Sequence, residues 1–394
     1  MNRYPQIYLK PKKDESLRRF HPWVFSGAIS HCDSVNDGDV VEVISSDGKF
    51  LAIGHYQIGS IAVRVLSFED EIIDATFWEK RLNAALEVRK STGLVDNKNN
   101  NVFRLIHGEG DNIPGLIIDC YGETSVMQAH SVGIHKSKEQ IATALIKIME
   151  GRIKNVYYKS ETTLPYKANL SQEDGFIVGK SIDDTAMENG LKFHVDWLKG
   201  QKTGFFIDQR ENRKLLESYA SNKKVLNMFC YTGGFSFYAL RGNAQLVHSV
   251  DSSEKAINLT NMNVDMNFPN DSRHTAFCED CFKFFERKDF DYDLIILDPP
   301  AFAKHRQALH NALKGYIRLN TKAFERIKRG GIVFTFSCSQ VVTKDNFRNA
   351  VFTAAAHANR NVRILHQLHQ PVDHPINIFH PEGEYLKGLV LYVE

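Results

Sequence analysis

The second half of the chain alternates short apolar runs with longer amphipathic segments. From residue 197 onward we predict strands at 225–230, 246–250, 294–297, 332–337, 362–367 and 386–392, and helices at 234–241, 253–267, 305–328 and 345–358. Strands and helices that alternate in this way form a mostly parallel sheet with helices on both faces. Residues 197–394 are therefore predicted to form an α/β domain.

The first half has a different pattern. Short strand-like segments at 40–44, 50–55 and 61–68 are separated by turn signals and predict a small barrel over residues 1–70. Residues 71–196 are mixed, with an amphipathic helix at 74–90, strands at 124–129, 155–159, 175–179 and 191–196, and a hairpin turn at 188–190. This stretch is predicted to be a central α+β domain. In the barrel, we expect Trp23 and Phe25 to fill the core.

Composition places the chain among ordinary globular proteins. It has 43% hydrophobic and 24% charged residues and a formal net charge of +2. Its six cysteines are irregularly spaced, and neither an apolar leader nor an 18-residue apolar run is present. We therefore expect a soluble, cytoplasmic protein without disulfides and without a membrane partner.

Basic side chains cluster near the N-terminus. Lys12, Arg18 and Arg19 are the candidates for contacts with nucleic-acid phosphates. A solvated basic arm is the more common outcome for such a run, so both interpretations stay open.

Ligands of a parallel sheet bind at the carboxyl ends of its strands, so the residues after each strand are the first candidates for a site. Gly233 and Gly234 follow the first strand and allow a tight turn with close backbone approach, although no G-x-G-x-x-G motif is present. Asp251 follows the second strand, where a carboxylate can accept two hydrogen bonds from a ribose diol. It could instead cap the next helix, a role that Ser252 or Ser253 could equally take.

A third candidate position lies around residue 280. Asp280 could accept a hydrogen bond from an adenine amino group. Cys278 and Cys281 beside it form a lone C-x-x-C pair, and no second pair has the spacing of a zinc site. We therefore expect two small, partly buried cysteines and no metal.

The most specific local signal is the segment Asp298-Pro299-Pro300-Ala301-Phe302. Two consecutive prolines make a rigid loop. Its acid could accept from an exocyclic amine, and Phe302 could stack on the face of a base. Cys338 ends the next strand, where a free thiol could act as a nucleophile.

With these strand ends collected, the sequence resembles the bacterial 23S ribosomal RNA cytosine-5 methyltransferases. The matching stretches are RRFHPWVFSGAI (18–29), EGDNIPGLIIDCYG (109–122), GQKTGFFIDQRENR (200–213), FCYTGGFS (229–236), DPPAFAK (298–304), FSCS (336–339) and PEGEYLKG (381–388). The resemblance implies a PUA-like barrel, a central domain and a Rossmann-like class I methyltransferase domain with a mostly parallel seven-stranded sheet. It also implies 23S ribosomal RNA as partner and hints at a homodimer.

The resemblance also implies the roles of particular residues. S-adenosylmethionine (SAM) would be the cofactor, held or bordered by Lys202, Thr203, Asp208, Thr232, Gly233, Gly234, Asp251, Ser252, Asp280 and Asp298. Cys338 would be the nucleophile, assisted by Asp298. The substrate would contact Pro299, Pro300, Phe302, Lys304, Lys12, Arg18 and Arg19.

One departure and two alternatives remain. RNA cytosine-5 enzymes usually carry a second cysteine after the proline of the fourth-strand motif, and none is present here, so product release must follow another route. Asp-Pro-Pro followed by an aromatic also resembles the loop of amine methyltransferases, which would make the product an N-methylated guanine or adenine. The other alternative is a catalytically silent RNA-binding assembly factor. A nicotinamide oxidoreductase is disfavoured because the dinucleotide motif is missing.

Overall fold

The computed structural model describes residues 4–165, 170, 173–181, 184–303 and 305–394. The chain divides into two compact units that exchange segments. The first unit contains Met1–Gly190, Val195–Ile207 and Val372–Gly383, and the second contains Leu191–His194, Asp208–Pro371 and Glu384–Glu394. The two domain boundaries expected from the sequence, at 70 and 196, remain predictions.

The N-terminal part of the first unit is a six-stranded sheet in the order β2-β6-β5-β4-β1-β3. Its strands are β1 (Gln6–Leu9), β2 (Trp23–Phe25), β3 (Ile29–Cys32), β4 (Val40–Ile44), β5 (Phe50–Tyr56) and β6 (Ile61–Ser67), with helix α1 (Glu15–Arg18) between β1 and β2. The three predicted strands are confirmed as β4, β5 and β6. Aliphatic side chains from these strands form the core, among them Ile7, Val41, Val43 and Val63.

The prediction for Phe25 was wrong. Its side chain is 47% exposed, whereas Val24 is 2% exposed and packs in the core. Successive residues of a strand face opposite sides, so burying Val24 turns both neighbours away from that core. Trp23 is only partly buried, and its indole nitrogen donates to Glu109 at 2.9 Å.

The central part of the first unit is a five-stranded sheet in the order β11-β10-β9-β8-β7. Its elements are α2 (Ala75–Ser91), β7 (Val102–His107), β8 (Leu116–Tyr121), β9 (Thr124–Ala129), α3 (Val132–Lys136), α4 (Lys138–Ile148), β10 (Asn155–Tyr158) and β11 (Gly175–Val178), and β12 (Thr185–Glu188) follows. The predicted helix at 74–90 is confirmed: Asp74 caps α2 by accepting from the Phe77 amide at 3.0 Å. Trp78, Leu82 and Leu86 bury one face of α2 in the core.

A segment from far along the chain completes the first unit. Residues 372–383, here called the C-terminal strap, belong to this unit although both flanking strands belong to the other. Arg89, fully buried, donates to both carboxylate oxygens of Asp111 and to the carbonyl oxygen of Asp373. The Asp373 carboxylate in turn accepts from the backbone amide of Arg104 at 2.9 Å. The strap is thus held by buried, charge-assisted hydrogen bonds.

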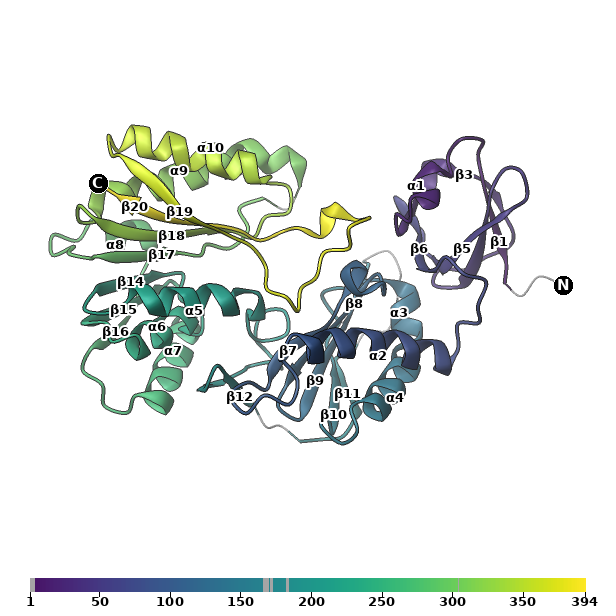
Figure 1. Ribbon diagram of the computed structural model, residues 1–394, viewed down its shortest axis with the longest axis horizontal. Coiled ribbons are helices and arrows are strands. Elements are labelled where there is room, and N and C mark those ends of the chain that lie inside the picture. The colour runs from purple at the N-terminus through teal and green to yellow at the C-terminus, as the bar shows by residue number, and fades with distance from the viewer. Residues whose placement is uncertain (1–3, 166–169, 171–172, 182–183, 304) are drawn as a thin grey trace. The chain divides into compact units, whose positions relative to one another are not determined.

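The second unit is built on a seven-stranded sheet in the order β16-β15-β14-β17-β18-β20-β19 (Figure 1). Its strands are β14 (Lys224–Met228), β15 (Leu246–Asp251), β16 (His274–Cys278), β17 (Leu294–Leu297), β18 (Gly331–Ser337), β19 (Val362–Leu368) and β20 (Lys387–Val393). β14 to β18 are parallel, and β20 runs antiparallel to both β18 and β19. The predicted α/β fold with a mostly parallel sheet is confirmed.

Helices cover both faces of this sheet, as Figure 1 shows. One apolar cluster contains residues of α8 (Cys281–Phe285), α9 (Leu309–Arg326) and α10 (Lys344–His357), and a second contains residues of α5 (Arg210–Tyr219), α6 (Gly234–Arg241) and α7 (Glu254–Asn267). The short strand β13 (Leu191–His194) packs beside α7. Among the described residues, none of the helices is both long and apolar enough for a membrane span.

Candidate active site

The site predicted from the sequence lies along one edge of the second unit's sheet. Because β14 to β18 are parallel, their carboxyl ends meet at the same edge. The residues at or just after the ends of these strands include Thr232, Asp251, Asp280, Asp298 and Cys338. Five side chains that are far apart in sequence therefore lie along the same edge of the sheet.

The turn between β14 and α6 is held in an unusual conformation by helix α7. Tyr231 and Gly233 both have positive φ angles, of 48° and 80°. The Thr260 hydroxyl donates to the carbonyl of Tyr231, and the Asn263 amide donates to that of Thr232, at 3.0 and 2.9 Å. A Cβ atom on Gly233 would come within 2.8 Å of Thr260, so only glycine fits. This leaves a stretch of bare backbone at the end of β14.

Asp251 is anchored but not covered. Its carboxylate accepts from the backbone amides of Tyr231 at 3.1 Å and Ser253 at 2.9 Å, and the residue is half-buried. Ser253, not Asp251, caps α7, by accepting from the Ala256 amide at 3.3 Å. Ser252 between them is exposed. A fixed, half-exposed carboxylate beside bare backbone fits a nucleoside with a ribose diol.

Asp280 acts as a helix cap. One of its oxygens accepts from the amides of Phe282 and Lys283, at 2.9 and 3.2 Å, at the start of α8. The two cysteines beside it differ, because Cys278 is exposed and Cys281 is buried. The expectation that both are partly buried was therefore wrong.

The loop after β17 lies against the end of β18. The Cys338 sulfur is 4.0 Å from the carbonyl oxygen of Pro299, and the Ser339 hydroxyl donates to the carbonyl of Ala303 at 2.5 Å. Asp298 and Cys338 are each half-buried, while Pro300 is exposed. The acid and the thiol predicted to cooperate therefore end neighbouring parallel strands.

Phe302 and Lys304 follow in the same loop. The Phe302 ring packs on Tyr316 of α9, with ring centroids 4.7 Å apart, so one of its sides is used for holding the loop. Stacking of Phe302 on a base stays a prediction. Lys304 lies outside the described residues.

Cys338 is less buried than Cys230 and Cys281, two other cysteines of this unit. Burial raises the pKa of Cys230 and that of Cys281 to about 12, which keeps both as thiols at neutral pH. Cys338 is half-buried. It is the better candidate for a nucleophile.

A lysine that sequence reasoning missed lies beside this cysteine. Lys387, the first residue of β20, pairs with Ser337 across the sheet. Its ammonium is buried and donates to the carbonyl oxygens of Ser339 at 2.7 Å and Tyr385 at 2.6 Å. Burial lowers its pKa to about 8. One sequence signal could have found it. Lys387 lies in the motif PEGEYLKG and is also the first residue of the apolar strand KGLVLYV.

The residues expected to border the cofactor pocket are divided between the units. Lys202 and Thr203 belong to the first unit and Asp208 to the second. Thr203 is fully buried and donates to Asp119 at 2.6 Å, and Asp208 accepts from the hydroxyl of Tyr385 at 2.7 Å. Their convergence on one pocket remains a prediction.

The three basic residues predicted to contact phosphates are exposed, and the two arginines among them are paired. Arg18 bonds Asp14 at 2.7 Å and Arg19 bonds Glu15 at 2.6 Å, both one turn apart on α1, and Lys12 is exposed. Exposed pairs of this kind are weak, so these arginines can exchange their partners for phosphates.

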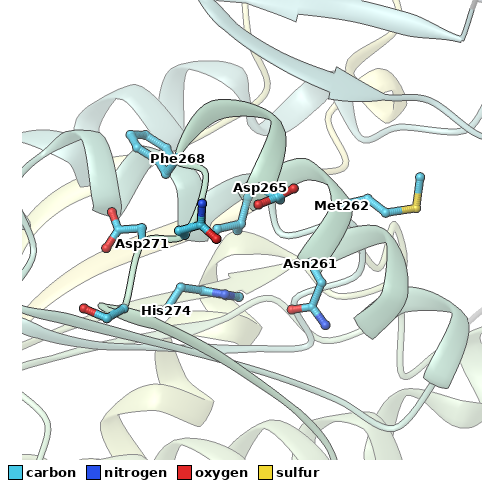
Figure 2. A pocket seen from close by; sticks show the side chains of 9 residues that line it. Asn261, Met262, Asp265, Phe268, Asp271 and His274 are labelled. Atoms are coloured by element: carbon cyan, nitrogen blue, oxygen red, sulfur yellow. The ribbon is translucent and has the colours of Figure 1, made fainter.

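Two surface hollows in the second unit lie elsewhere. The one in Figure 2, of about 500 Å³, is formed by α7 and the segment leading into β16, including Asn261, Asp265, Phe268, Asp271 and His274. A second, of about 320 Å³, includes Lys224 and Leu246. Lys224, Leu246 and His274 begin their strands, so both hollows lie near the amino ends of the sheet, away from the predicted site.

The strand order, the antiparallel strand β20 and the acid at the end of β15 define a class I methyltransferase, and comparison with known proteins agrees. Residues 166–378 match a model described as S-adenosylmethionine-dependent methyltransferase, and residues 7–68 match a PUA-like domain. The crystal structure of SMU.776, a putative methyltransferase complexed with S-adenosylhomocysteine (SAH), aligns with a TM-score of 0.85 at 22% identity, covering 98% of this chain and 99% of that one. Trm5b from Pyrococcus abyssi aligns with a TM-score of 0.53 at 18% identity, over 70% of this chain and 74% of its own.

The sequence relatives are closer. The "Ribosomal RNA large subunit methyltransferase I" of Alteromonas mediterranea is 39% identical, covering 98% of both chains, and that of Aeromonas salmonicida is 38% identical over the same shares. The chain belongs to the ribosomal RNA large subunit methyltransferase I family, with an N-terminal PUA-like domain and SAM as its methyl donor.

Proposed function

We propose that this protein methylates carbon 5 of a cytosine in 23S ribosomal RNA, with Cys338 as a covalent nucleophile. The relatives are named as large-subunit ribosomal RNA methyltransferases, which supports RNA of that subunit as the substrate. The observation that carries the cytosine-5 assignment is the half-buried Cys338 thiol, 4.0 Å from the Pro299 carbonyl of the Asp298-Pro299-Pro300 loop.

The chemistry requires a nucleophile because carbon 5 of cytosine is itself a poor nucleophile while the ring is aromatic. The Cys338 thiolate forms a bond to carbon 6, and the electron pair of the 5,6 double bond makes carbon 5 nucleophilic. SAM, when bound, would supply an electrophilic methyl group to that carbon and would leave as S-adenosylhomocysteine. A base then takes the proton from carbon 5, the electron pair of that carbon–hydrogen bond re-forms the 5,6 double bond, the sulfur–carbon bond breaks and the thiolate is released.

Asp298 holds the base during these steps. In its protonated form, the Asp298 carboxyl group accepts a hydrogen bond from the exocyclic amine and donates to N3, which stabilises the negative charge that develops there when the thiolate attacks. The prolines that follow limit its movement, so carbon 6 is kept near the sulfur. Asp251 and the bare backbone at Gly233–Gly234 are proposed to bind the ribose and the rest of the methyl donor.

The PUA-like domain is proposed to bind the RNA backbone. Lys12, Arg18 and Arg19 are the phosphate contacts in this proposal. The target base must leave its helix to reach the thiol, so a loop or locally opened segment is the expected substrate. Homodimer formation stays a prediction.

Mass analysis of nucleosides tests the proposal. Large-subunit ribosomal RNA and whole particles, both lacking the modification, are incubated with SAM and the protein, then digested. We expect 5-methylcytidine from the wild type and from Cys278→Ala, whose exposed cysteine ends β16 at the far edge of the sheet. Cys338→Ala should lose turnover but keep SAM binding in calorimetry. An N-methylated guanine or adenine, or full activity of Cys338→Ala, would overturn the covalent mechanism, and failure to bind SAM would favour a silent assembly factor.

A further inference from the structure

The buried ammonium of Lys387 lacks an anion in contact with it. Its hydrogen bonds go to two neutral carbonyl oxygens, those of Ser339 and Tyr385. Within the described residues, no carboxylate lies within ion-pair distance of its nitrogen; the charged groups that act on it are Glu384, Lys344 and Cys338. Burying a cation without a paired anion is costly, so a lysine at such a place is expected to serve a purpose.

Sheet register connects this ammonium to the thiol. Lys387 pairs with Ser337, and its nitrogen bonds the carbonyl of Ser339, so it holds the residues on both sides of Cys338. An ammonium has three protons, and the two carbonyls take two of them. The third is available to an anion, and the ionised Cys338 thiol is the group whose charge acts most strongly to raise the pKa of Lys387.

We propose that Lys387 is a positioning residue that stabilises the Cys338 thiolate and fixes the backbone of the strand end that carries it. The inference deepens the cytosine-5 proposal and rests on it for its role in catalysis. A cation beside a cysteine favours the thiolate, which is the nucleophilic form. When the thiolate attacks carbon 6, its charge moves to the base, and on release it returns to the neighbourhood of the ammonium.

Protonation of Lys387 gives this arrangement a pH limit. Burial lowers the pKa of Lys387 to about 8, while the charge of Cys338, and that of Glu384, raise it and Lys344 lowers it. The cation is therefore present below pH 8 and is lost as the pH rises through that value. Support for the thiolate should fade in the same range.

Alkylation of Cys338 tests the charge coupling without RNA. The full chain is treated with iodoacetamide between pH 6 and 9, and the Cys338 peptide is quantified by mass spectrometry. In the wild type, the pH at which the alkylation rate is half its maximum should lie below the ordinary cysteine pKa of about 8.5. In Lys387→Met it should move up by at least about one pH unit, which makes alkylation about ten-fold slower at pH 7.

The control is Lys344→Met, which removes an exposed lysine that pairs with Glu384 and also faces Lys387. It should leave Cys338 reactivity within about two-fold. A wild-type midpoint at or above 8.5 overturns the proposal even if Lys387→Met does not fold. An unchanged rate in folded Lys387→Met, checked by circular dichroism and SAM binding, also overturns it.

RNA containing 5-fluorocytidine separates this inference from the proposed function. Fluorine at carbon 5 prevents the last elimination, so the cysteine adduct accumulates. Lys387→Met should form the adduct about ten-fold more slowly at pH 7 and approach the wild-type rate at pH 9. No adduct with the wild type refutes the cytosine-5 mechanism, whereas an adduct whose rate and pH profile ignore the lysine refutes the role of Lys387 alone.

Discussion

Replacing Arg89 with methionine should be among the most damaging single changes in the first unit. Arg89 and the carboxyl group of Asp111 are 0% and 4% exposed, and two hydrogen bonds of 2.5 and 2.8 Å join them. Arg89→Met leaves the Asp111 carboxylate buried without its cation and frees the carbonyls of Arg104 and Asp373. Removal of one partner of a buried pair costs about 3–5 kcal/mol.

The melting temperature measures this loss. For a unit of this size, about 2–4 °C per kcal/mol predicts a decrease of roughly 6–20 °C, read by circular dichroism. Hydrogen exchange should show that the C-terminal strap loses protection with the rest of the unit. Adding Asp111→Asn should recover part of the loss, because the uncompensated charge is removed while an oxygen remains for the His107 amide.

The matched control is Arg152→Met. Arg152 pairs with Asp96 through bonds of similar length, but the two side chains are 33% and 62% exposed. An exposed pair contributes about 1 kcal/mol or less. If the loss of unfolding free energy in Arg89→Met is within about 1 kcal/mol of the loss in this control, the buried pair does not hold the strap.

Three further predictions concern the donor site, the packing and the pH response. Asp251→Ala should weaken SAM binding about 10- to 100-fold in calorimetry, because two hydrogen bonds to a charged acceptor are lost; unchanged affinity would remove Asp251 from the site. Gly133→Ala places a Cβ 2.1 Å from the ring of His55 and should destabilise by about 1–3 kcal/mol in urea unfolding, whereas Gly27→Ala, with nothing within 4 Å, should cost far less. Burial lowers the pKa of His55 to about 4, so between pH 6.5 and 4 the unfolded chain takes up a proton that the folded chain refuses. Stability should therefore fall as the pH decreases through that window, and His55→Asn should show a smaller fall; an identical pH slope contradicts this.

Local sequence patterns were sufficient to predict most of the strands and helices of the second unit. The central strands are continuous apolar runs, and their order of alternation with helices determines a parallel sheet whose carboxyl ends meet. Strand β16 was missed because His274–Cys278 is a half-exposed edge strand without a clear apolar pattern. The positions of Asp251, Asp298 and Cys338 followed from the strands they end.

Features that depend on register or on distant segments were not predictable in this way. Phe25 was assigned to the core from its residue type, while the alternation of β2 buries Val24 instead. A lysine at the start of an apolar strand resembles a surface residue, and only the pairing of Lys387 with Ser337 reveals that it is buried beside Cys338. The bond between Arg89 and Asp373 joins residues whose relation no local pattern records.

The C-terminal strap has a consequence for how the protein can be made. The ribosome must synthesise nearly the whole chain before Asp373 can meet Arg89, so the first unit cannot reach its final packing while only its N-terminal segments exist. A fragment that stops at residue 207 would lack a buried anion and carbonyl that Arg104 and Arg89 require. Dividing this enzyme into separately expressed halves would therefore damage the half that appears complete in the sequence.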